Sequence, residues 1–268
     1  MAFICLKTNN KEVINYLTQN YINSEYIYHV KKFKSFINFF IFSNDKNTLI
    51  KEFSLVLSKY ISYNLEPTFL NNILKKNYFY FTNNDKKIIL ENFKSINNNN
   101  NNNLFYIKEP LETFLLNNKY INFEGFINFR LYNYKYYLED LLTKAINQFV
   151  IDKEYLKYVT LLKKYVQENN PKIDNVNLIY INNSGILLDS NYKKIELTSL
   201  NCQYFSDISF SKNDLILNTL IDLLPEKIIL HLLSNEENEF IKTINLIFEN
   251  KVCICPGCKL CKSINQLL

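Results

Sequence analysis

Several residue types are scarce in this chain of 268 residues, which contains no Trp, one Met, three Gly and five Pro. With three glycines it has no Gly-rich stretch that could cradle phosphates, so nucleotide-binding folds built on such loops are excluded. Its longest apolar stretch, Phe36–Phe42, contains Asn38 and falls far short of the about 20 residues that a membrane-spanning helix needs. The N-terminal segment turns polar at Lys7 and lacks the apolar core of a signal peptide. We therefore expect a cytoplasmic protein without a membrane span.

Lys, Asn, Ile, Tyr and Phe are heavily used and have AT-rich codons, whereas Arg occurs once. Mutational pressure toward AT explains most of this bias. The aromatic fraction of 15% has the same origin, and we expect these side chains to pack in the core. The net charge of +5 is spread along the chain and forms no basic block, so a nucleic-acid partner is not favoured. The run of seven Asn residues, 97–103, is expected to form a disordered loop.

The order of predicted elements indicates a helix-rich α+β fold in two regions joined by that loop. Residues 1–96 are expected to form an N-terminal α+β region, residues 97–103 the loop, and residues 104–268 a C-terminal α/β region with a Cys-rich end. In the first region, two β-rich runs flank a turn near Lys34–Ser35, which predicts a hairpin. An apolar stripe at helical spacing follows over Thr48–Tyr63.

Two long helices are predicted to open the C-terminal region. The first covers Phe126–Val150, and Asp152 is a natural N-cap for the second. The expected buried face of the first helix repeats at helical spacing and consists of Phe126, Phe129, Tyr137, Leu141, Ala145 and Phe149. A small β-meander is expected from Asp174 onward, and a capping box of Ser211 with Asp214 starts the next helix.

A βαβ unit is predicted to follow. KIILHLL, residues 227–233, is typical of a buried strand, a capping box of Ser234 with Glu237 starts a helix, and KVCIC, residues 251–255, is a second strand. Strands joined by such a crossover are normally parallel. The cysteines then begin at the carboxyl end of a parallel strand, where ligand sites tend to form in open α/β sheets.

Four of the six cysteines fall within nine residues, at Cys253, Cys255, Cys258 and Cys261. In a reducing cytosol, clustered cysteines indicate ligands or redox groups more than disulfides. The second and third of them flank a Pro-Gly turn, as in a zinc knuckle, and zinc takes four ligands arranged as a tetrahedron. The cluster therefore favours a metal site, with zinc as the expected ion.

Geometry argues against a site made from these four thiols alone. Cys253 and Cys255 lie two residues apart, so in a strand their side chains share one face and are separated along it. We expect two or three of the cysteines to bind the metal together with Cys202, with His231, or with a second subunit. His231 ends the strand KIILH, and a parallel neighbouring strand could end beside it.

Three other interpretations of the cluster remain open. Cys255 and Cys258 form a C-x-x-C pair, which can lower a thiol pKa and cycle through a disulfide. The C-x2-C-x2-C spacing also occurs in iron–sulfur sites, although no second cluster motif is present. The cysteines could also be reduced thiols without a ligand.

Arg130 is the only arginine among the 31 Lys and Arg residues, in a chain whose AT-rich codon usage favours lysine. This exception suggests a need for a planar fork, which binds a carboxylate or phosphate with two hydrogen bonds. The structural alternative is a buried ion pair with Glu124, Glu154 or Asp174. No nucleophile lies near either histidine in the sequence, so no catalytic triad is proposed and a non-enzymatic protein is favoured.

Three further stretches have a recognisable pattern, namely Glu124–Leu142, Asp152–Ile179 and Asp214–His231, the last running into VCICPGCKLC. They resemble the YtxC-like family, a sporulation protein family of endospore-forming Firmicutes. The resemblance covers most of the second half of the chain, and its most specific pattern is GF-x-x-FRL-x-x-Y. It implies a cytosolic protein linked to sporulation, and it brings no catalytic residues that could be assigned here.

These observations lead to one main hypothesis and two alternatives. The main hypothesis is a non-enzymatic, sporulation-associated protein whose C-terminal cysteine cluster binds zinc and supports docking of a protein partner or a second copy. The first alternative is a thiol redox protein or redox sensor that uses the CPGC pair. The second is a nucleic-acid-associated factor, which a zinc knuckle and the positive charge would permit.

Overall fold

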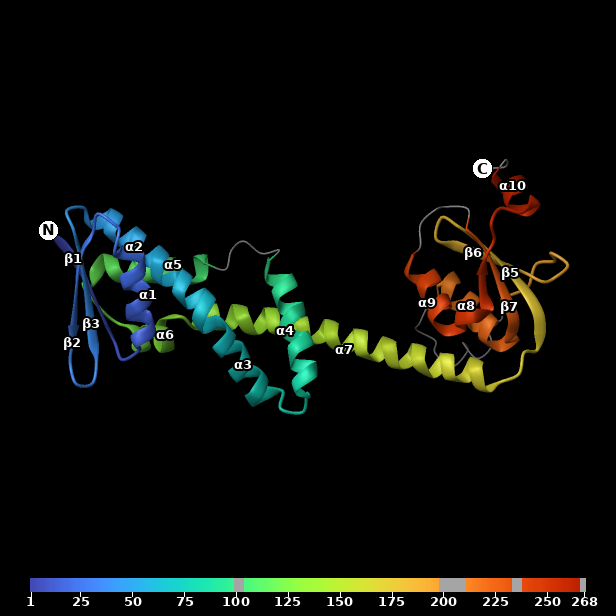
Figure 1. Cartoon of the computed structure of the whole chain (residues 1–268), viewed down its shortest axis with the longest axis horizontal. Coiled ribbons are helices and arrows are strands. Elements are labelled where there is room, and N and C mark those ends of the chain that lie inside the picture. Colours follow the sequence, from blue (N-terminus) through green and yellow to red (C-terminus); the bar gives the residue numbers. More distant parts are fainter. Residues whose placement is uncertain (99–103, 198–210, 233–237, 266–268) are drawn as a thin grey trace. The chain divides into compact units, whose positions relative to one another are not determined.

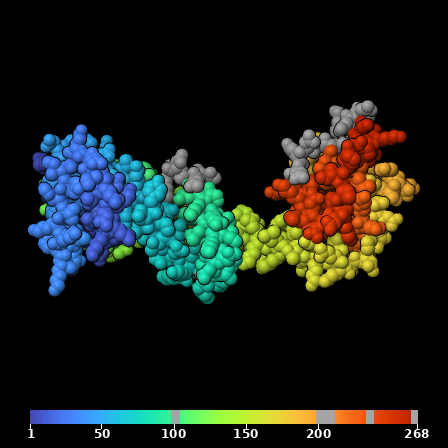
Figure 2. All heavy atoms as spheres, viewed as in Figure 1, coloured from blue at the N-terminus to red at the C-terminus, as the bar shows by residue number. Residues whose placement is uncertain are grey.

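The computed structural model of the chain describes residues 1–98, 104–197, 211–232 and 238–265 (Figure 1). They form a helix-rich α+β protein with two small mixed sheets, as the sequence predicts. The chain folds into two compact units, Met1–Ile151 and Asp152–Leu268, and each has its own hydrophobic core. In the space-filling view the atoms of each unit pack into a body of their own (Figure 2). Among the described residues, no helix combines the length and the apolar character needed to cross a bilayer.

Unit 1 contains a four-stranded sheet in the order β2-β3-β1-β4. Its strands are β1 (Ala2–Thr8), β2 (Ile27–Lys32), β3 (Ile37–Ser43) and β4 (Tyr120–Asn122). The predicted hairpin is confirmed, because β2 and β3 pair antiparallel on either side of Lys34 and Ser35. β1 pairs antiparallel with β3 and parallel with β4, so it occupies the centre of the sheet, where Leu6 is fully buried.

The helices of unit 1 bury one apolar stripe each against this sheet and against one another. They are α1 (Lys11–Tyr21), α2 (Lys46–Tyr60), a π-helical turn (Ile61–Leu65), α3 (Glu66–Asn77), α4 (Asn83–Asn98), α5 (Phe105–Asn117), α6 (Phe123–Arg130) and α7 (Tyr132–Glu168). The last helix crosses the boundary between the two units, and its residues up to Phe149 belong to the core of unit 1.

A buried polar pair lies inside this helical core. The hydroxyl of Tyr134 donates to Oε2 of Glu66 at 2.5 Å, and Glu66 also accepts from the side-chain amide of Asn97 at 3.4 Å. Tyr134 is fully buried and Glu66 is 9% exposed. Burial, followed by the charge of Glu66, raises the pKa of Tyr134. A carboxyl in such surroundings needs these donors, since an unpaired one is costly to bury.

Unit 2 contains a second sheet in the order β6-β5-β7-β8. Its elements are β5 (Ile173–Ile181), β6 (Ser184–Leu188), α8 (Lys212–Leu223), β7 (Pro225–Leu232), α9 (Glu239–Phe248), a 3-10 turn (Glu249–Lys251), β8 (Val252–Ile254) and α10 (Lys259–Asn265). The predicted crossover is confirmed, because β7 and β8 are parallel, and β5 is parallel to β7 as well. The capping box of Ser211 and Asp214 is present at the start of α8.

One face of this sheet forms the core of unit 2. Alternate residues of the strands, among them Leu178 and Leu230, pack with buried residues of α8 and α9 and with Val159 and Val166 of α7. The opposite face carries the residues in between, including Asn177 and His231. These two polar side chains are nevertheless buried, so this second face is also covered.

Two predictions for the long helices are wrong. The chain does not break at Asp152, because α7 runs through this residue and contains no Gly or Pro that would end it. Phe129 is 79% exposed instead of buried. The helix interrupts its phase at Leu131, with φ of −98° and ψ of 31°, so the periodicity of α6 does not continue into α7.

Some predictions concern residues outside the described part of the chain. Residues 99–103 of the Asn run, Cys202, and the capping pair of Ser234 and Glu237 are among them. The helix that follows this pair begins at Glu239, with Asn238 as its N-cap. The division of the chain at residues 97–103 stays a prediction.

We predict that Tyr134→Phe lowers the free energy of unfolding by about 1–3 kcal/mol, because it removes a donor from a buried carboxyl. Tyr136→Phe is the matched control, since Tyr136 lies on the same helix and is 75% exposed. Urea denaturation of both variants measures the difference. Equal stability of the two would show that the hydrogen bond to Glu66 contributes nothing.

Candidate metal centre

The candidate site lies where β7 and β8 end side by side. Their parallel register pairs Leu230 with Ile254, and the next amide, that of Cys255, donates to the carbonyl of Leu230 at 2.9 Å. The ladder therefore extends as far as Cys255. His231 follows Leu230 on the neighbouring strand, so backbone pairing alone brings the imidazole and the first thiol of the site to the same edge.

A tight turn after β8 brings the chain back toward His231. Gly257 adopts φ of +111°, which L side chains rarely adopt, and a Cβ built on it would meet nothing within 4 Å. The turn therefore requires glycine for its backbone conformation and not for lack of space. After the turn, the carbonyl of Cys258 accepts from the amide of Lys262 at 3.1 Å, so Cys258 caps the start of α10. Cys261 then lies in the first turn of this helix.

Four ligand atoms converge at this point. They belong to His231, Cys255, Cys258 and Cys261, and all lie within 4.8 Å of one another. Nδ1 of His231 is 3.2 Å from Sγ of Cys261 and 3.6 Å from Sγ of Cys258. Sγ of Cys261 is 3.7 Å from Sγ of Cys258 and 3.8 Å from Sγ of Cys255. The group could hold a metal ion, and its spacing suits one ion better than a multi-iron cluster.

Asn177 orients the histidine from the other side. Nε2 of His231 lies 3.1 Å from Oδ1 of Asn177, whose Nδ2 donates to the carbonyl of Asp189 at 3.1 Å. Because the amide nitrogen is engaged with that carbonyl, Oδ1 is left to accept, and Nε2 must carry the proton. Nδ1 is then unprotonated and turned toward the three thiols. A histidine that donates its second N–H in this way has the arrangement of a metal ligand.

The proton affinities of the site differ from residue to residue. The backbone amide of Cys261 holds the pKa of Cys258 below its usual value, despite some burial. Burial raises the pKa of Cys261 to about 11. Burial lowers the pKa of His231, which favours the neutral imidazole that a metal requires.

The remaining predicted residues lie apart from this group. Cys253 is in the middle of β8, paired with Ile229, and does not belong to the four converging ligands. Cys202 lies outside the residues that the structure describes. Arg130 belongs to unit 1, is exposed, and forms no ion pair with any described carboxylate. The structure thus shows no buried ion pair for this arginine.

Sequence reasoning missed Asn177. An indication was available, because DNVNLIYI is a strand in which Asn177 interrupts a run that is buried on both faces, from Val176 to Tyr180. An amide at such a position needs a polar partner. Without the pairing of β5 with β7, however, nothing in the sequence connects it with His231.

Comparisons with known proteins agree with the family resemblance. A family model described as the YtxC-like family matches residues 51–253. The uncharacterized protein YtxC of Bacillus subtilis (strain 168) is 24% identical over 152 residues, which is 56% of this chain and 53% of that protein. The chain thus spans about half the length of the curated relative that it matches. No solved structure matches the chain. The family match includes Asn177 and His231 but ends before Cys255.

We predict that Asn177→Ala weakens Zn²⁺ binding by about 10- to 100-fold, the usual effect of removing a hydrogen bond that orients a ligand. Competition with a chromogenic chelator measures the affinity. Asn175→Ala is the control, since Asn175 lies two residues away on β5 and is exposed. Asn177→Asp keeps an acceptor for His231 and should retain binding. Unchanged affinity in Asn177→Ala would show that the imidazole needs no such support.

Proposed function

The chain belongs to the YtxC-like family, and we propose that it is a non-enzymatic protein of sporulating cells whose unit 2 is completed by one zinc ion. His231, Cys255, Cys258 and Cys261 would bind this ion. The observation that carries the proposal is the convergence of their four ligand atoms within 4.8 Å. The sporulation setting is what the family resemblance implies, and the geometry supports the metal.

The distances between the ligand atoms suit zinc. With Zn–S bonds of about 2.3 Å, two sulfurs of a tetrahedron lie about 3.8 Å apart, and with Zn–N of about 2.0–2.1 Å a nitrogen and a sulfur lie about 3.5 Å apart. The sulfur pairs here are separated by 3.7 and 3.8 Å, and Nδ1 lies 3.2 and 3.6 Å from two sulfurs. The remaining two pairs lie within 4.8 Å and would close toward the same separations around the ion.

A site with three thiolates and one imidazole indicates a structural role. Catalytic zinc sites keep one position open for water or substrate, whereas structural sites fill all four positions with protein ligands. The four residues here supply one ligand atom each. This favours a non-enzymatic protein over a zinc hydrolase.

The ion would fasten α10 to the sheet. This helix has seven residues, which is too short for a helix to be stable by itself. Of its side chains described, from Lys259 to Ser263, Cys261 alone is buried. Apolar packing is therefore a weak attachment, and bonds from Cys258 and Cys261 to a shared ion would provide most of it. A fixed α10 would present a defined surface to a protein partner or a second copy.

A redox function is the second candidate. It is favoured by one observation, the lowered pKa of Cys258, since a thiolate is the reactive form of cysteine. In this case Cys258 would form a disulfide with Cys255 or Cys261, and no metal would be retained.

We predict about one zinc ion per chain in protein purified anaerobically without a metal-affinity tag, as expected for a four-ligand site. Cys255→Ser/Cys258→Ser should lose the ion. Cys253→Ser is the matched control and should keep it, because Cys253 precedes the site on the same strand without joining it. Elemental analysis gives the metal content.

The outcomes separate the two candidates. Metal-free native protein with a reversible disulfide would contradict the zinc site and support the redox function. One zinc ion per two chains would contradict a site completed within one chain. Loss of zinc in Cys253→Ser would contradict the ligand assignment.

The sporulation role is tested in the cell. We predict that deleting the gene reduces the yield of heat-resistant spores, and that the wild-type chain restores it whereas Cys255→Ser/Cys258→Ser does not, because α10 is then released. Complementation with Cys253→Ser should succeed. Normal spore yield in the deletion strain would remove the sporulation role and leave the metal site untouched.

A further inference from the structure

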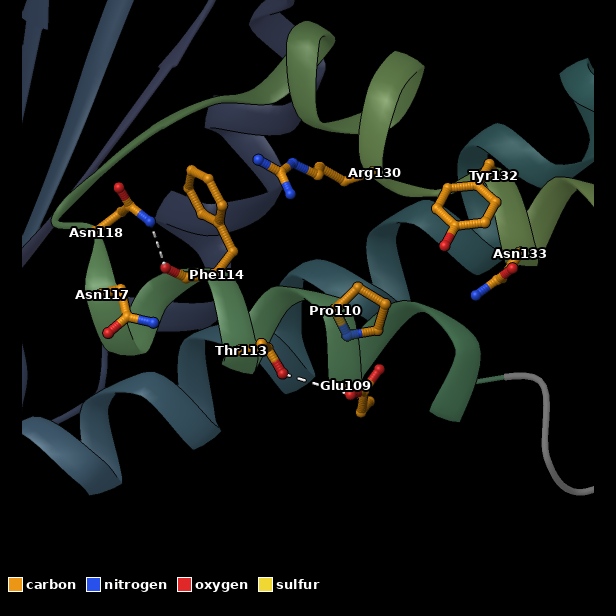
Figure 3. A pocket seen from close by; sticks show the side chains of 9 residues that line it. All are labelled: Glu109, Pro110, Thr113, Phe114, Asn117, Asn118, Arg130, Tyr132 and Asn133. Atoms are coloured by element: carbon orange, nitrogen blue, oxygen red, sulfur yellow. Dashed lines mark hydrogen bonds between the residues drawn. The ribbon is translucent and has the colours of Figure 1, made fainter.

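A second candidate site lies in unit 1, far from the cysteines in the sequence. It is a surface cavity of about 370 Å³ between α5 and the junction of α6 with α7 (Figure 3). Its polar lining consists of Glu109, Thr113, Asn117, Asn118, Arg130, Tyr132 and Asn133. We propose that this cavity binds a small carboxylate ligand through the guanidinium of Arg130.

Arg130 has the properties of a ligand-binding arginine. Its guanidinium lies over the ring of Phe114, with Cζ 5.7 Å from the ring centroid. Contact with an aromatic ring positions the cation without an acid partner. No described carboxylate forms an ion pair with it. The N–H donors of the fork are therefore available to a group that enters the cavity.

The choice of arginine is itself informative. Arg130 is the only arginine among the 31 Lys and Arg residues of the chain. A lysine could supply the same charge and a similar contact with the ring. Lys135 does so on α7, where its Nζ lies 5.7 Å from the centroid of Phe69. What lysine lacks is the planar fork, which forms two parallel hydrogen bonds with a carboxylate.

The rest of the lining suits a polar ligand of this kind. The side chains of Asn117 and Asn133 form no hydrogen bond within the described part of the chain, so both can serve a ligand. Asn118 uses Nδ2 on the carbonyl of Phe114, at 2.9 Å, which leaves its Oδ1 as an acceptor (Figure 3). A volume of about 370 Å³ is at the lower end of the range for small-molecule sites.

Charge favours a carboxylate over a phosphate. Arg130 is the only cation in the lining, and Glu109 contributes a negative charge to the same cavity. A phosphate dianion would bring two negative charges to one positive and one negative group. A carboxylate group brings one negative charge instead of two, and hydrogen-bonding substituents of the ligand can reach the amides.

The single arginine allows a direct test. Labelling the full chain with ¹⁵Nε-arginine gives one Nε–H signal, which needs no assignment. We expect this signal to shift and saturate on titration with L-glutamate or trialanine, at millimolar concentrations or below. Sodium chloride at matched ionic strength should produce no saturation. Saturation by trialanine alone would identify a peptide C-terminus as the source of the carboxylate.

Matched variants, followed by calorimetry with the same probes, complete the test. Arg130→Lys should abolish saturable binding although the charge remains, whereas Lys135→Gln should leave binding intact. Glu109→Gln should tighten binding, because it removes one like charge from the same cavity. Shifts that follow ionic strength alone with every carboxylate, or saturation with inorganic phosphate alone, would overturn the proposal.

Discussion

The parallel pairing of β5, β7 and β8 is the constraint on which the candidate metal centre depends. The ladder between β7 and β8 places His231 beside Cys255, and the ladder between β5 and β7 places Asn177 within reach of the same imidazole. Each strand supplies one group, and none of the three is near another in sequence. Backbone hydrogen bonds therefore position His231, Cys255 and Asn177 before any metal–ligand bond forms.

The two units depend on different kinds of interaction. Unit 1 has a large apolar core, in which a buried polar pair, Glu66 with Tyr134, is satisfied internally. Unit 2 has one apolar face packed against helices, while its other face includes the buried polar residues Asn177 and His231. The short helix α10 buries only Cys261 among its described side chains. A bound ion would compensate for this deficit.

Sequence patterns predicted the features that depend on local rules. The hairpin around Lys34, the crossover before Cys253 and the capping box of Ser211 follow from turn residues, buried-strand composition and cap chemistry. Two features needed tertiary information. The exposure of Phe129 follows from the non-helical backbone angles of Leu131, which separate the periodicity of α6 from that of α7. The role of Asn177 follows from the register of β5 with β7. The prediction that Asp152 begins a helix was wrong. A residue that can cap a helix does not end the helix before it, and α7 contains no Gly or Pro that would end it there.

The choice of an amide to orient His231 has a further consequence. Many metal-binding histidines are held by a carboxylate, which loses its negative charge when it is protonated. The side chain of Asn177 does not titrate, so its Oδ1 can accept from Nε2 of the imidazole in acidic and in neutral solution alike. Competition between protons and a metal would then be confined to the ligand atoms themselves, and acid would release the ion by protonating them while their support stays in place.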